Sequence, residues 1–95
     1  MDVKVRGVEL YSERGALLPD ETFLLEPEPE NTIDPNAIKV LRLYTDTGRK
    51  SHVGYIQQER AEEVSALLTE NNVTCTVIPP LNPVEANMRL TFTKK

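Results

Sequence analysis

The apolar and polar positions along the chain follow the pattern of a small β protein. Val3 and Val5 alternate with Lys4 and Arg6, and a period of two is typical of a strand with one buried face. Gly7 interrupts this first run, which predicts a bulge or a close backbone approach. Similar runs recur, and together they predict strands at 3–10, 21–28, 36–45, 51–56, 73–80 and 88–95.

The run at 36–45 is apolar on most of both faces, which predicts a strand in the centre of the sheet. After the strand at 51–56, the spacing of the apolar positions changes from that of a strand to that of a helix. One face of a helix that we expect from about residue 57 to about residue 70 carries Ala61, Val64, Leu67 and Leu68. Strands, one main helix and further strands predict a mainly β, α+β fold. We expect a small antiparallel sheet or barrel with the helix packed over an open end.

Length and composition limit the function classes. The 95 residues, 39% hydrophobic and 27% charged, predict one soluble globular domain over residues 1–95. No apolar run approaches the roughly 18 residues of a membrane span, and the N-terminus lacks the apolar segment of a signal peptide. Cys75 is the only cysteine, which excludes an intramolecular disulfide and favours a cytoplasmic or nuclear compartment. The net charge of −4 argues against non-specific binding of polyanions but allows a small local site.

Catalytic and metal-binding patterns are weak. His52 is the only histidine, no nucleophile is placed beside it, and we interpret it as a surface or hydrogen-bonded residue. Glu26, Glu28, Glu30 and Asp34 raise the question of a cation site in a metal-dependent nuclease. The prolines between the first three stiffen this run, and a solvated acidic loop is the favoured interpretation. We therefore expect no enzyme activity, no metal and no cofactor.

The loop before the central strand carries the most informative polar residues. Asn31, Asp34 and Asn36 have short side chains that bond readily to neighbouring backbone, so one interpretation is that they only brace the loop. The other is that the same groups form a preorganised frame that grips a ligand hydroxyl or phosphate. The residue chemistry alone favours bracing.

The stretch EPENTIDPNAIKVL, followed after a short hairpin by VGYI and then by the helix QQERAEEVSALL, closely resembles the HIRAN domain family. The opening VRGVELY and the closing MRLTF also resemble the first and last strands of that family. The resemblance covers almost the whole chain. It implies an OB-like barrel that recognises the 3′-hydroxyl end of single-stranded DNA, without catalysis, in replication, repair or a phage context.

The resemblance also implies an end pocket. Asp34 would accept a hydrogen bond from the 3′-hydroxyl, and Asn31 would support the same pocket. Asn36 would brace the loop. Tyr11 falls where the first strand of the family supplies an aromatic ring that stacks on a base.

The remaining implied contacts involve phosphates and a second ring. Tyr55 lies where the family has a His or Tyr near the terminal phosphate, Gly54 would let the backbone approach that phosphate, and Lys39 or Arg49 would supply the positive charge. Phe92 matches a C-terminal aromatic residue. Its place on one strand face with apolar neighbours, however, favours burial in the core over stacking.

The chain departs from the family pattern in its first strand. Fork-remodelling members carry Arg-Tyr-Tyr where this chain has Glu9, Leu10 and Tyr11, so one cation and one ring are missing. An acidic surface with this departure supports an alternative function, a protein–protein interaction module on the same scaffold with little affinity for DNA.

Overall fold

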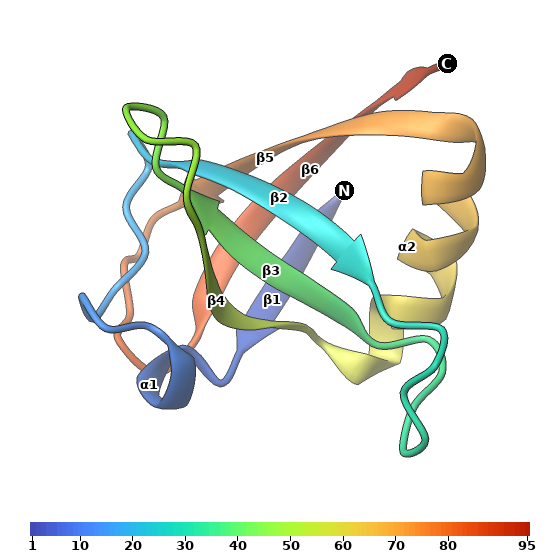
Figure 1. Ribbon diagram of the computed structural model, residues 1–95, viewed down its shortest axis with the longest axis horizontal. Coiled ribbons are helices and arrows are strands. Elements are labelled where there is room, and N and C mark those ends of the chain that lie inside the picture. Colours follow the sequence, from blue (N-terminus) through green and yellow to red (C-terminus); the bar gives the residue numbers. More distant parts are fainter.

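Six antiparallel strands close into a barrel in the computed structural model, which describes residues 1–95 (Figure 1). The order of the strands around the barrel is β1-β4-β3-β2-β5-β6. The strands are β1 (Asp2–Arg6), β2 (Thr22–Pro27), β3 (Ile38–Leu43), β4 (Lys50–Ile56), β5 (Asn71–Ile78) and β6 (Ala86–Lys94). This architecture confirms the predicted mainly β fold with one main helix.

Apolar side chains at alternate positions of the strands point inward and fill the barrel. Val3 and Val5 of β1 are buried, and so are Met88 and Leu90 of β6, with exposed or half-buried residues between them. Strand β3 is fully buried on the face of Ile38, Val40 and Arg42, and its other face is mostly half-buried. The barrel is closed, so no strand is central in the predicted sense, because every strand has two neighbours. The inward side chains join one core of 15 buried residues. Burial of apolar surface in this core is the main stabilising term, at roughly 25 cal/mol per Å².

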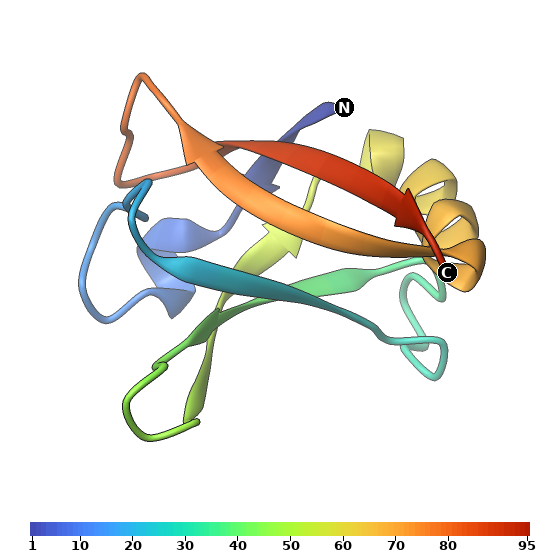
Figure 2. The ribbon, with the colours of Figure 1, turned by 90° about the horizontal axis from the view of Figure 1, so that it is seen from above.

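The main helix, α2 (Gln58–Glu70), lies within one residue of its predicted bounds. Ala61 and Val64 are its buried residues, and the helix packs beside one end of the barrel (Figure 2). Neither helix of the chain has the length and apolar character needed to cross a membrane.

The first predicted strand is too long. It ends at Arg6, and Val8–Tyr11 form a short helix, α1, instead of extending the strand. Gly7 causes the change because it takes a φ of +82°, a left-handed conformation that glycine adopts without steric cost. Tyr11 therefore lies at the end of a helix that packs on β4, and not on a strand.

A buried ion pair connects the barrel to the α1–β2 connection, the loop of residues 12–21. Arg42 of β3 is only 2% exposed and forms a salt bridge with Glu21. Its guanidinium donates hydrogen bonds to Glu21 Oε1 at 3.1 Å and to Ser12 Oγ at 3.5 Å. A buried arginine requires such partners, because an unpaired charge in a core is strongly unfavourable.

Candidate nucleic-acid interface

The β2–β3 loop holds its shape through two side chains that bond to the backbone. Asn31 Oδ1 accepts hydrogen bonds from the backbone N–H groups of Ile33 and Asp34, both at 2.9 Å. Asp34 Oδ1 in turn accepts one from the N–H of Asn36 at 2.9 Å. Asn31 and Asp34 thus brace the loop, and the side chain of Asn36 takes no part in these bonds. The second carboxylate oxygen of Asp34, Oδ2, forms no hydrogen bond within the protein and remains a free acceptor.

The same loop forms one wall of a hollow of about 340 Å³. Its lining residues come from α1, the β2–β3 loop, the end of β4 and the start of α2. The lining residues are Tyr11, Asn31, Ile33, Asp34, Ala37, Tyr55, Ile56 and Gln58. Tyr11, Asn31, Asp34 and Tyr55, four of the residues predicted from the sequence, therefore meet around one cavity.

Three aromatic rings form one cluster at the edge of this hollow. Tyr11 stacks on His52 with centroids 4.2 Å apart and an interplanar angle of 27°. Tyr55 contacts both rings edge-on, at 5.8 Å from Tyr11 and 4.8 Å from His52. Tyr11 remains partly accessible to a ligand, because it lines the hollow and is 42% exposed.

Sequence reasoning missed His52 as a member of this cluster. A period of two puts residues 52 and 55 on opposite faces of a strand, but the pairing of β3 with β4 shifts register between Val40 and Leu41. Gly54, in the same strand, is the sequence signal for that irregularity.

Gly54 serves the packing of two strands. A Cβ atom on it would lie 2.7 Å from Val5 Cγ1 and 2.8 Å from the Arg6 carbonyl oxygen. Glycine is therefore needed for β1 to approach β4. This close approach is enough to explain why residue 54 is a glycine. The phosphate contact that the family resemblance implies at Gly54 is not needed to explain it.

The pKa of His52 is lowered by its surroundings. Burial among the other rings is the largest cause, and the charge of Lys39 acts in the same direction. The Nε2 atom of His52 donates a hydrogen bond to the Gly54 carbonyl at 2.9 Å, which opposes the shift in pKa. The neutral imidazole therefore predominates at neutral pH.

Glu28 links the loop to β3 and β4. Its carboxylate lies 3.4 Å from Lys39 Nζ and accepts a 3.4 Å hydrogen bond from Asn31 Nδ2. The Tyr55 hydroxyl is the main cause of the lowered pKa of Glu28. Burial and the Glu28 carboxylate together raise the pKa of Tyr55 to about 12, so the phenol stays protonated and can donate. Nothing in the sequence distinguishes Glu28 from the neighbouring solvated acids.

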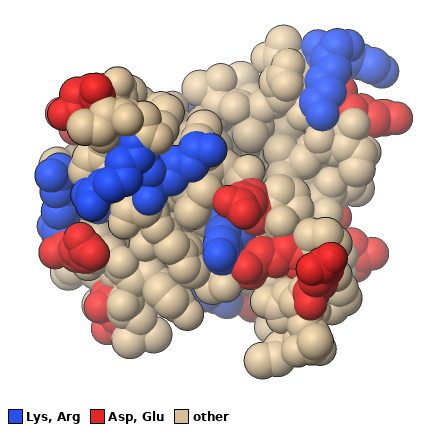
Figure 3. All heavy atoms as spheres, viewed as in Figure 1, with Lys and Arg blue, Asp and Glu red and all other residues tan.

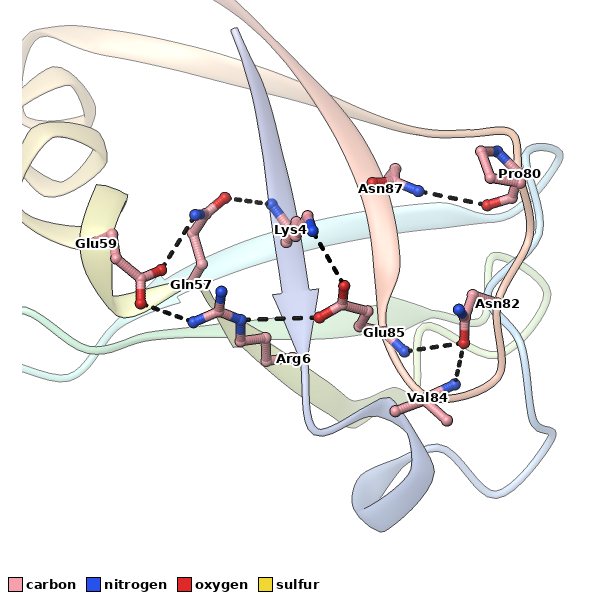
Figure 4. A network of polar contacts seen from close by, with 9 residues as sticks. All are labelled: Lys4, Arg6, Gln57, Glu59, Pro80, Asn82, Val84, Glu85 and Asn87. Carbon is pink, nitrogen blue, oxygen red and sulfur yellow. Dashed lines mark hydrogen bonds and ion pairs between the residues drawn. The ribbon is translucent and has the colours of Figure 1, made fainter.

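The cations near the hollow are paired with acids. Lys39 pairs with Glu28, and Arg6 pairs with Glu59 at 2.7 Å and with Glu85 at 3.8 Å. Lys4 completes a surface network through Glu85 (Figure 4). Acidic side chains gather over the β2–β3 loop, at the lower right of Figure 3. The hollow is therefore a locally neutral to acidic site. No three His, Cys, Asp or Glu side chains meet in a geometry that could hold a metal ion.

Two predicted residues lie away from the hollow. Arg49 is in the hairpin between β3 and β4, with its guanidinium 4.5 Å from the centre of the Tyr44 ring. Phe92 on β6 is half-buried and packs against the core. Ile33, by contrast, has no distinguishing signal in the sequence, yet it lines the hollow and is 95% exposed.

Comparison with known proteins gives one family and one structure. The sequence model of the HIRAN domain matches residues 1–93. The crystal structure of the HIRAN domain of human HLTF superimposes with a TM-score of 0.79 at 24% sequence identity, and the match covers 100% of this chain and 75% of that one. This similarity supports the fold. No curated protein matches the chain.

Proposed function

The chain belongs to the HIRAN domain family, and from this premise we propose that it is a non-catalytic module that binds the 3′-hydroxyl end of single-stranded DNA. Such a module would act in replication or repair. The observation that supports the proposal best is the position of Asp34. Asp34 and Tyr11 both line the hollow, and the Asp34 carboxylate keeps one oxygen without a hydrogen-bond partner.

A carboxylate at this position suits a terminal hydroxyl and disfavours a terminal phosphate. The free Oδ2 of Asp34 accepts a hydrogen bond from a 3′-hydroxyl, and hydrogen bonds to a charged acceptor are among the stronger ones. Two like charges about 4 Å apart repel by roughly 1–4 kcal/mol near a protein surface. Asn31 contributes by fixing the backbone N–H of Asp34. Asp34 would therefore select a strand end over a strand interior.

The Tyr11 and His52 rings supply affinity that does not depend on the base sequence of the DNA. A base that stacks on the exposed part of the Tyr11 ring gains roughly 1–3 kcal/mol, whichever base it is. One face of this ring lies on His52, which holds the tyrosine ring in place. Stacking on a ring that is already ordered loses little conformational entropy.

Lys39 and Tyr55 are the groups proposed to contact the terminal phosphate. The Tyr55 phenol stays protonated and can donate, and Lys39 supplies the charge once it leaves Glu28. Asn36 has a bracing role through its N–H. Arg49 and Phe92 have no part in the proposed end pocket, because Arg49 lies at the Tyr44 ring in the β3–β4 hairpin and Phe92 packs against the core.

Fluorescence anisotropy at low salt tests this function. We would compare a 5′-labelled strand with a 3′-hydroxyl, the same strand with a 3′-phosphate, and a strand whose 3′-hydroxyl carries the dye. The proposal predicts the tightest binding to the free hydroxyl. Equal affinity for all three strands would contradict end recognition.

A second candidate function is binding of a protein segment on the same scaffold. Leu10 and Ile33 are 78% and 95% exposed, and the acids around the hollow already pair with the nearby cations. These features suit a peptide with an apolar side chain better than a polyanion. Recovery of one defined protein partner, together with no measurable DNA binding at low salt, would support this function.

A further inference from the structure

The cations of this chain divide into two groups. Six of its 11 Lys and Arg residues form ion pairs with acids. The residues outside these pairs are Arg14, Arg49, Lys50, Lys94 and Lys95. In a chain of net charge −4, a negatively charged ligand binds most readily at unpaired cations, because no acidic side chain of the protein competes with it there.

Three of these unpaired cations gather at the hairpin between β3 and β4. Arg14 and Arg49 both lie over the ring of Tyr44, at 5.0 Å and 4.5 Å from its centroid, and Lys50 follows Arg49 in the chain. All three cations are exposed, and Tyr44 is half-buried. Basic side chains form a run at the upper left of Figure 3, where this hairpin lies. We call Arg14, Tyr44, Arg49 and Lys50 the hairpin cluster.

The geometry of the cluster favours phosphate. A guanidinium whose flat face lies on an aromatic ring keeps its N–H groups free at its edge, and these donors match phosphate oxygens. Contact with the Tyr44 ring also restricts both arginines before a ligand arrives. Asp20 and Asp46 line one pocket together with Arg14 and Tyr44, but neither is within ion-pair distance of a cation of the cluster.

The cluster and the hollow lie at opposite ends of β3 and β4. Strand β3 has six residues between them, which at about 3.3 Å per residue is roughly 20 Å. Strand β4 runs from Lys50 at the cluster to Tyr55 at the hollow, and half-buried His52 lies between them. OB folds cover about 4–16 nucleotides of single strand, so one strand is long enough to reach both places.

We infer that the hairpin cluster is a second contact for the same DNA strand, and that it binds backbone phosphates several nucleotides from the 3′ end held in the hollow. This inference rests on the proposed end recognition and extends it. The hollow supplies specificity for the end, and the cluster supplies sequence-independent affinity, which lets a protein of net negative charge retain a polyanion. The affinity must then increase with strand length.

The test compares two strand lengths by NMR titration of the full chain. A trinucleotide with a 3′-hydroxyl reaches only the hollow, whereas a twelve-nucleotide strand reaches both places. The Arg14→Ala/Arg49→Ala variant should bind the long strand several-fold more weakly and the trinucleotide as the parent does. Its plot of log affinity against log salt should be less steep by about 1.4, since each phosphate that an arginine no longer neutralises lowers the slope by about 0.7.

The matched control is Lys94→Ala/Lys95→Ala, which removes the same charge from unpaired cations at the C-terminus. It should leave both affinities nearly unchanged. An equal loss in both double variants would overturn the inference, because net charge and not the hairpin cluster would then set the affinity. Unchanged DNA binding in the arginine variant would also overturn it, and an acidic protein segment would become the candidate ligand.

Failure of the end recognition has a different signature. The parent would then bind 3′-hydroxyl and 3′-phosphate strands equally at every length, whatever the arginine variant does. If instead only the further inference fails, the preference for the hydroxyl persists and the affinity is independent of length.

Discussion

Tyr11 stacks on His52 at a centroid distance of 4.2 Å, which ties the short helix α1 to the outer side of β4. The stacked pair forms one edge of the hollow, and its two members come from distant parts of the chain. The ring proposed to receive a base is thus held by a titratable imidazole.

Protonation of His52 should weaken the fold. Its folded-state pKa lies below the ordinary value of 6.5, so the unfolded chain takes up the proton first as the pH falls. The free energy of unfolding should therefore decrease as the pH falls through about 6.5 and level off below the folded-state pKa. Urea denaturation at pH 7.5 and 5.5 measures this decrease, and it should be smaller in His52→Gln. If the free energy of unfolding decreases equally in the parent and in His52→Gln, groups other than His52 cause the decrease.

The buried Arg42–Glu21 pair should matter more than a surface pair. Glu21→Gln leaves a guanidinium that is 2% exposed without its counter-charge, and removal of one partner of a buried pair costs about 3 kcal/mol. Glu63→Gln breaks the exposed pair with Arg60 and should cost less than about 1 kcal/mol. Chemical denaturation compares the two variants. Similar losses of stability in the two variants would mean that Arg42 finds other partners in the folded protein.

Glu28 should restrain DNA binding. Its carboxylate holds Lys39 at 3.4 Å and faces the Tyr55 hydroxyl, so Glu28→Gln releases both groups to a phosphate. We expect this variant to bind a 3′-hydroxyl strand more tightly and with a steeper salt dependence. Glu30→Gln removes the same charge from the same loop without releasing Lys39. Equal gains in DNA affinity in Glu28→Gln and Glu30→Gln would show that net charge alone causes the tighter binding.

Much of the fold was predictable because burial repeats with the period of each element. The alternation in β1 and β6 and the helical face of Ala61 and Val64 match the observed burial. The error after Arg6 has a local cause. A single glycine with positive φ ends the strand, whereas its position in the sequence predicted a bulge or a close backbone approach.

The site was only partly predictable, because it depends on contacts between distant segments. The loop motif identified Asn31 and Asp34, whose short-range bonds are encoded within a few residues. The stacking of His52 depends on a register shift in the barrel, and the separation of Arg49 from the hollow depends on the length of β3. The register shift does not appear in the periodicity of the sequence, whereas strand β3 was predicted and the consequence of its length for Arg49 was missed.

The most direct test of the central claim is the ratio of the affinities for 3′-hydroxyl and 3′-phosphate strands, measured in the parent protein and in Asp34→Asn. Asparagine keeps an oxygen to accept the hydrogen bond from the Asn36 N–H, so the loop should stay intact while the charge is removed. We predict that the parent prefers the hydroxyl by about tenfold or more, since about 1.4 kcal/mol of repulsion corresponds to a factor of ten. The ratio should fall towards one in Asp34→Asn and stay unchanged in Glu62→Gln, which removes an exposed charge from α2. A parent protein without this preference, or an Asp34→Asn variant that keeps all of it, would contradict the account.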